Sequence, residues 1–222
     1  MNVIPSILVQ FPDRLTEELD RLVPFYKRFQ VDYADGHFVP GITAHLEDLF
    51  ERLVAYPQCQ FDIHLMTSDY EKALDVINTY LDRVKFNAVF IHHRSSPPPE
   101  LFIDSDRPYN VGLVLDPQDE IETIKHIYNL PNIKNIQLMT VVAGAQGRDF
   151  IPEVLNKIDQ LRSVDYKNSI ILDGSINLDT LKVILQHTKQ PDYVCPGSYF
   201  SHADDVEKRV QDLAVALMSG KQ

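Results

Sequence analysis

The sequence predicts an α/β fold, a (β/α)8 barrel that occupies residues 1–222 as a single domain. Eight short apolar runs recur along the chain, and stretches with apolar residues three and four apart lie between them. Strands that alternate with helices in this way form a parallel sheet covered by helices, and eight such units fit a compact barrel of 222 residues. A doubly wound open sheet is the alternative that the same alternation allows.

The strands are expected in the eight apolar runs, which span residues 2–9, 29–34, 60–66, 88–93, 110–116, 135–142, 169–174 and 192–197. The helical periodicity is clearest over residues 15–29 and 149–164, and it is shorter over 119–130 and 177–188. Polar residues at 116–118 and 175–177 are suited to starting the helices that follow them. The proline-rich stretch 95–100 is too short to separate two domains.

The acidic composition narrows the class of partner that the protein can have. The net charge is -11 and no basic run stands out, so neither a nucleic acid nor an anionic membrane is expected as a partner. An acidic chain can still bind a small phosphate through its backbone N–H groups. Cys59 and Cys195 form no CxxC pair and are expected to be buried thiols in a reducing compartment. The chain carries no recognisable signal peptide or transmembrane run, which predicts a cytoplasmic protein.

Active sites of such barrels lie at the carboxyl ends of the strands, where several polar residues of this chain are expected. They are Ser6, Gln30, Asp32, Asp35, Asp62, His64, His92, His93, Asp116, Asp173, Ser175 and Ser198. Asp32, His64 and Asp173 come from the second, third and seventh predicted strands, and their oxygen and nitrogen atoms suit a divalent cation. The alternative is that each of the three is hydrogen-bonded to its neighbours without any ligand.

Glycine-rich turns after the last three strands indicate a phosphate site. Glycine lets backbone N–H groups approach an anion closely, and barrels often bind phosphate at the loops after the seventh and eighth strands. The alternative is that these are simple turns. The residues concerned are Gly144, Gly147, Gly174, Ser175, Gly197 and Ser198.

A series of motifs matches one enzyme family from end to end and in order. The motifs are PSIL (5–8), VDYADGHFVP (31–40), FDIHLM (61–66), GLVLDP (112–117), LMTVVAGAQGRDFIPEVL (138–155), ILDGSI (171–176) and GSYF (197–200). In these motifs the chain resembles the ribulose-phosphate 3-epimerase family. The resemblance implies interconversion of D-ribulose 5-phosphate and D-xylulose 5-phosphate, or of related ketose phosphates, by epimerisation at C3. It also implies a sugar phosphate as the bound molecule and a homo-oligomer.

The resemblance further implies roles for individual residues. Asp32 and Asp173 map to two aspartates that exchange the C3 proton on opposite faces of the substrate, and epimerisation beside a carbonyl does call for a base on each side. Asp32, His64 and Asp173 map to three of four ligands of a divalent metal ion, commonly zinc. Met66 and Met139 map to methionines beside the reacting carbons. Ser6, at the end of the first strand, is also expected to contact the substrate.

Two of the departures from the family pattern bear on whether the activity is kept. Gln30 stands where the family has its fourth metal ligand, a histidine. The loop after the sixth strand reads VAGAQGR, where the family usually has Asn-Pro-Gly-Phe-Gly-Gly-Gln. Two alternatives to the epimerase follow. One is a catalytically impaired homologue that binds sugar phosphates, and the other is an aldol-type lyase acting on a hexulose phosphate. The lyase ranks below the others because no lysine lies on the predicted strand ends.

Overall fold

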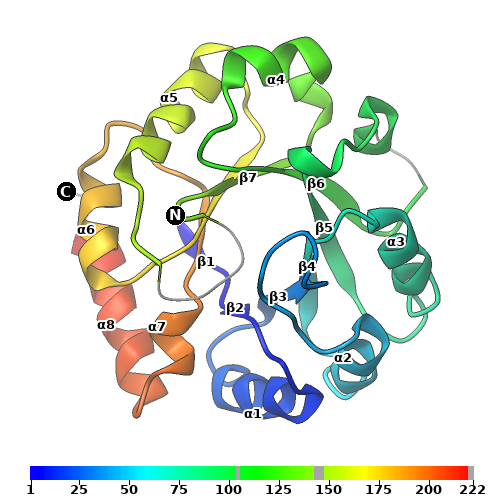
Figure 1. Ribbon diagram of the computed structural model, residues 1–222. Coiled ribbons are helices and arrows are strands. Elements are labelled where there is room, and N and C mark those ends of the chain that lie inside the picture. The colour runs from blue at the N-terminus through cyan, green and yellow to red at the C-terminus, as the bar shows by residue number, and fades with distance from the viewer. Residues whose placement is uncertain (104–105, 143–147, 220–222) are drawn as a thin grey trace.

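A computed structural model describes residues 1–103, 106–142 and 148–219. Its strands form one parallel sheet, in the order β1-β9-β8-β7-β6-β5-β4-β3-β2. The nine strands are β1 (Asn2–Val3), β2 (Ser6–Ile7), β3 (Arg28–Ala34), β4 (Gln60–Met66), β5 (Phe86–His92), β6 (Asn110–Leu115), β7 (Asn135–Met139), β8 (Ser169–Asp173) and β9 (Tyr193–Cys195). Figure 1 shows these strands around a central axis, with the helices outside them.

The sheet closes on itself through the first two strands. β1 pairs with β9 and β2 pairs with β3, so residues 2–7 lie between the two ends of the sheet. Pro5 separates the two pieces, and its carbonyl accepts a hydrogen bond from the backbone N–H of Gln30 at 2.8 Å. On the other side, the N–H of Ser6 donates to the Pro196 carbonyl at 3.1 Å. The predicted barrel is therefore confirmed, and the open doubly wound sheet is wrong.

The helices cover the barrel with their apolar faces turned inward. They are α1 (Pro12–Leu22), α2 (Leu46–Leu53), α3 (Tyr70–Asn78), α4 (Ile121–Ile127), α5 (Asn156–Ser163), α6 (Leu178–Gln186), α7 (Ser198–Ser201) and α8 (Val206–Ser219). Short 3-10 turns add η1 (His93–Ser95), η2 (Pro99–Phe102), η3 (Leu130–Asn132) and η4 (Pro152–Leu155). In the described part of the chain, no helix is long and apolar enough to cross a membrane.

Two predicted helices are shorter than the periodicity indicated. The helix expected over 15–29 ends at Leu22, because Pro24 has no N–H for a helical hydrogen bond and the chain then enters β3 at Arg28. The stretch 149–164 divides into η4 and α5. By contrast, α6 begins where predicted, since the Asn177 side chain accepts hydrogen bonds from the N–H groups of Asp179 and Thr180.

The amino end of the barrel is closed by a buried charge cluster. Asp62 on β4 is fully buried, and it accepts hydrogen bonds from Arg28 Nε and from Asn87 Nδ2, each at 2.8 Å. Burial raises the pKa of Asp62, while the Arg28 guanidinium opposes that rise. Asp62 had been predicted among the strand-end candidates, on the same face as His64. It lies two residues earlier on the strand and serves as the anion of a structural ion pair.

Candidate active site and metal centre

Three buried side chains converge at the carboxyl end of the barrel. Asp32 lies on β3 directly opposite His64 on β4, and Asp173 is the last residue of β8. His64 Nδ1 is 3.2 Å from Asp32 Oδ1 and 3.4 Å from Asp173 Oδ2. One ligand atom from each residue lies within 4.8 Å of the other two, which is the spacing of a possible metal site. The predicted convergence of Asp32, His64 and Asp173 is therefore observed.

Gln30 links the two carboxylates of this cluster. Its side chain is fully buried, and Nε2 donates hydrogen bonds to Asp32 Oδ1 at 3.0 Å and to Asp173 Oδ2 at 2.7 Å. Its Oε1 faces the buried thiol of Cys195, with Sγ at 3.6 Å. The amide thus places its donor end between two like-charged groups, where it offsets part of their repulsion.

Burial and hydrogen bonding shift the protonation of the cluster in opposite directions. Burial raises the pKa of Asp173, and the nearby Asp32 carboxylate raises it further, whereas His64 and Gln30 lower it. Burial alone would lower the pKa of His64, but hydrogen bonds to Asp173 and Asp32 outweigh it and raise that pKa to about 9. Hydrogen bonding therefore favours the protonated form of His64, and burial favours the neutral form of Asp173.

Two further polar residues face the cluster, and one of them, Gln137, was missing from the predicted set. Gln137 on β7 donates from Nε2 to Asp173 Oδ2 at 2.9 Å, and its buried Oε1 has no hydrogen-bond partner in the described structure. His92, the last residue of β5, meets the His64 ring through its Nε2, with the ring centroids 5.0 Å apart and the ring planes 20° from parallel. Strand alternation could have found Gln137, which lies two residues before Met139 and so shares its face.

The other predicted contact residues line the same end of the barrel. Ser6 Oγ donates to Asp32 Oδ2 at 2.9 Å. Met66 and Met139 belong to the buried apolar cluster inside the barrel. Asp35 instead accepts hydrogen bonds from the backbone N–H groups of the loop that follows it, so it shapes that loop.

The turn after β8 has a conformation that requires glycine. Gly174 has φ +117, and a Cβ atom there would lie 2.6 Å from a methyl group of Val141. Ser175 follows with φ 51, and its hydroxyl donates to the Arg148 carbonyl. Gly197 and Ser198 stand at the start of α7, after β9. The two remaining predicted glycines, Gly144 and Gly147, lie outside the described residues.

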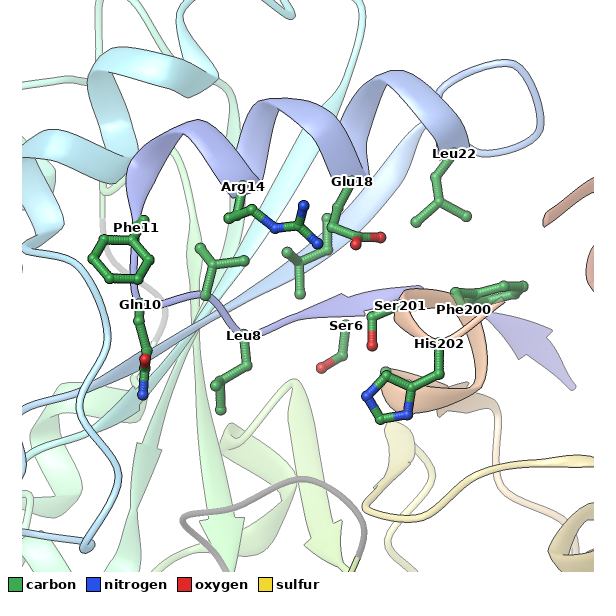
Figure 2. A pocket seen from close by; sticks show the side chains of 13 residues that line it. Ser6, Leu8, Gln10, Phe11, Arg14, Glu18, Leu22, Phe200, Ser201 and His202 are labelled. Atoms are coloured by element: carbon green, nitrogen blue, oxygen red, sulfur yellow. The ribbon is translucent and has the colours of Figure 1, made fainter. Parts of the chain in front are cut away.

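A cavity of about 290 Å³ adjoins this end of the barrel (Figure 2). Ser6 and Gly197 line it, together with Arg14 and Glu18 of α1 and with His202 beyond α7. In Figure 2 the Ser6 side chain points away from α1, on the side of the strand where His202 lies. Two predicted substrate-contact residues therefore border this cavity as well as the barrel mouth.

Comparison with known proteins identifies a family for this barrel with its Asp32, His64 and Asp173 cluster. The model of the "Ribulose-phosphate 3 epimerase family" matches residues 2–200. The chain belongs to this family. It is accordingly a carbohydrate-phosphate epimerase, an isomerase, as the motifs predicted. The alternative of a catalytically impaired homologue finds no support in the comparisons.

Relatives of the same name occur in distant organisms. The Methanocaldococcus jannaschii ribulose-phosphate 3-epimerase is 28% identical over 200 residues, which cover 86% of this chain and 79% of the relative. The Mycobacterium leprae protein is 31% identical over 185 residues, covering 81% of this chain and 80% of the relative. The Schizosaccharomyces pombe protein is 24% identical and covers 100% of this chain and 96% of the relative.

Solved structures share the fold at low sequence identity. Streptococcus mutans KGPDC in complex with D-R5P superposes with a TM-score of 0.72 at 10% identity, over 98% of this chain and 97% of that chain. A 3-hexulose-6-phosphate synthase superposes with a TM-score of 0.61, also at 10% identity, over 97% of this chain and 99% of that chain. These likenesses establish the barrel architecture.

The donor set fits a divalent metal ion. Two carboxylates and one imidazole are borderline-hard ligands, and catalytic sites often hold a divalent ion with three protein ligands and an open position. The three ligand atoms lie within 4.8 Å of one another. Gln30 directs its amide nitrogen to the carboxylates and its oxygen to Cys195, so it adds no fourth ligand in this arrangement.

Proposed function

We propose that the protein interconverts D-ribulose 5-phosphate and D-xylulose 5-phosphate by two-base proton transfer at C3. In this proposal Asp32 and Asp173 are the two catalytic residues. The observation that carries the proposal is that these two buried carboxylates, from β3 and β8, contact the same two side chains. Both accept a hydrogen bond from the Gln30 amide, and both lie within 3.4 Å of His64 Nδ1. Since the carboxylates come from separate strands, they can reach a substrate carbon from different directions.

Epimerisation at C3 needs two groups that transfer protons, one of them ionised and the other protonated. One carboxylate removes the C3 proton and leaves an enediolate, and the other carboxyl group returns a proton to the opposite face of the same carbon. The raised pKa of Asp173 suits it to carry that proton, because burial favours its neutral form. Each turnover removes one proton from C3 and returns one, so no net proton is gained or lost, and the two residues exchange roles in the reverse reaction.

Asp32, His64 and Asp173 are proposed to hold a divalent metal ion, which we take to be zinc. When bound, the ion would stabilise negative charge on the enediolate oxygens as a Lewis acid. The protein side chains have separate tasks. His64 keeps the carboxylates together through contacts of 3.2 and 3.4 Å, and Gln30 and Gln137 orient Asp173 through hydrogen bonds of 2.7 and 2.9 Å.

The phosphate of the substrate is proposed to bind at the turns after β8 and β9. Gly174 and Ser175 form one turn, and Gly197 and Ser198 form the other. Backbone N–H groups in such turns bind anions without a basic side chain, which is consistent with the acidic net charge of -11. Gly144 and Gly147 are proposed to complete the phosphate site.

The proposal is tested by replacing each carboxylate with its neutral amide. Asp32→Asn and Asp173→Asn should each lower kcat by ~10²–10⁴-fold, the usual worth of a general acid–base group. Asp159→Asn, which changes a carboxylate on α5 that pairs with His187, serves as the control and should keep full activity. Substantial turnover by folded Asp173→Asn protein would exclude the two-base mechanism.

A further inference from the structure

We propose that His92 and Asp116 are positioning residues, which fix the tautomer and ring orientation of His64 through a chain of contacts. The chain runs from the candidate metal site to the rim of the barrel. The inference rests on the proposed function only for its consequence for metal binding, and the tautomers that it assigns follow from the geometry alone.

The first link joins the two imidazoles. His64 Nε2 and His92 Nε2 are 2.8 Å apart, and the rings are nearly parallel at 20°. Two ring nitrogens at this distance share one proton, because one of them must donate and the other must accept. Both rings are buried, so water does not compete for this contact.

The groups around His64 leave two arrangements for that proton. Nδ1 of His64 faces Asp32 and Asp173. If Nδ1 binds a cation, its lone pair is used and the ring proton sits on Nε2. If no cation is bound, Nδ1 carries a proton toward the carboxylates, and Nε2 of His64 either donates to His92 or accepts from it. His64 Nε2 therefore donates to His92 when a cation is bound, and the tautomer of His92 decides between the two arrangements when none is bound.

The second link, between His92 and Asp116, decides between these arrangements. A neutral His92 that accepts at Nε2 carries its proton on Nδ1. His92 Nδ1 lies 3.3 Å from Asp116 Oδ1, and it has no aligned hydrogen-bond partner in the described structure. The opposite tautomer would place the Nδ1 lone pair against a carboxylate, which is unfavourable. Asp116 therefore selects the tautomer that lets His92 accept from His64.

The outer end of this chain of contacts is held by Arg94 in η1 and by Phe38 in the loop after β3. Arg94 Nε is 3.7 Å from Asp116 Oδ2, and the Arg94 guanidinium lies 4.0 Å from the centre of the Phe38 ring. The Phe38 ring meets His92 edge-on, with centroids 5.0 Å apart. His92 is thus confined between His64 on one side and Phe38 on the other. Metal-ligating histidines are commonly oriented by a carboxylate on their second nitrogen. Here the His92 imidazole lies between the second nitrogen of His64 and the carboxylate of Asp116.

The first test reads the tautomers directly by long-range ¹H–¹⁵N NMR of the histidine rings in chelator-treated protein. The wild type should show His92 protonated at Nδ1 and His64 protonated at Nε2. In Asp116→Leu the His92 preference should be lost, and Asp116→Asn, which keeps an acceptor oxygen, should restore it. A wild-type His92 protonated at Nε2 would overturn the proposal, whether or not the protein binds a metal.

The second test measures Zn²⁺ affinity by competition with a chromogenic chelator. His92→Phe keeps a flat ring but removes both nitrogens, and it should weaken Zn²⁺ binding ~10–100-fold, the usual effect of losing a group that orients a ligand histidine. Asp116→Leu should also weaken Zn²⁺ binding. His187→Phe alters a histidine–carboxylate pair on the outer helices and should leave the affinity unchanged. Wild-type affinity in folded His92→Phe would contradict the positioning role. Absence of Zn²⁺ binding by the wild type would count against the proposed metal site, and the tautomers would still decide this inference.

Discussion

Replacing Gln30 with leucine tests how the carboxylate pair is held together. Gln30 is fully buried and donates to Asp32 at 3.0 Å and to Asp173 at 2.7 Å. Leucine has nearly the same size but offers no donor, so the substitution removes both hydrogen bonds without opening a large cavity. The two carboxylates then lose the group that offsets part of their mutual repulsion.

The magnitude follows from the two contacts. A hydrogen bond to a charged group contributes ~1.5–3 kcal/mol, so two of them amount to ~3–6 kcal/mol. Burial of an apolar side chain in place of an amide recovers part of this, and we expect a net loss of about 3 kcal/mol in the free energy of unfolding. For a domain of this size, that loss corresponds to a fall in Tm of ~6–12 °C.

The assay is thermal and denaturant unfolding of chelator-treated protein, with and without added Zn²⁺. Gln60→Leu, at the exposed start of β4, is the matched control and should change stability by no more than about 0.5 kcal/mol. With Zn²⁺ the cost of Gln30→Leu should shrink, because a cation between the carboxylates supplies the positive charge that the amide otherwise supplies. A Gln30→Leu variant as stable as the control would refute this reasoning, and so would a loss that Zn²⁺ leaves unchanged.

Three further outcomes are expected. Gln137→Leu removes the second amide that donates to Asp173, and it should lower kcat ~10–100-fold with little change in KM. An unchanged kcat would exclude a role for Gln137 in orienting Asp173. Asp62→Ala leaves Arg28 without its buried anion and should lower the free energy of unfolding by ~3–5 kcal/mol in urea titrations, a loss under about 1 kcal/mol being contrary to the account. The pKa of His64 is raised from 6.5 to about 9, so its stabilisation of metal-free protein should be complete below pH 6.5 and lost as the pH rises through 9. His64→Gln should flatten the stability profile in that window, and a profile identical to wild type would contradict the assignment.

The sequence was sufficient to predict the barrel and the convergence of its polar strand ends. The carboxyl ends of parallel strands meet at one mouth of a barrel, so Asp32, His64 and Asp173 could be expected together once their strands were recognised. The split of the first strand at Pro5 and the early end of α1 before Pro24 are local effects. They were missed because the apolar runs continue across both prolines.

The depth of a side chain along its strand could not be predicted in the same way. Asp62 and His64 share a face by alternation, yet Asp62 joins Arg28 at the amino end and His64 joins the carboxylates. Strand alternation gives the face, whereas the stagger between neighbouring strands decides which residues meet at one level. The same uncertainty concealed the contact of Gln137 with Asp173 and the contact of His92 with His64.

The central claim is that two carboxylates move the C3 proton of a ketose phosphate. The most direct measurement follows solvent deuterium into C3 of D-ribulose 5-phosphate by NMR in heavy water, with Zn²⁺-saturated protein. The account predicts deuterium at C3 together with the appearance of D-xylulose 5-phosphate, both abolished in Asp173→Asn. Folded wild-type protein that leaves the C3 hydrogen unexchanged and forms no D-xylulose 5-phosphate would contradict it.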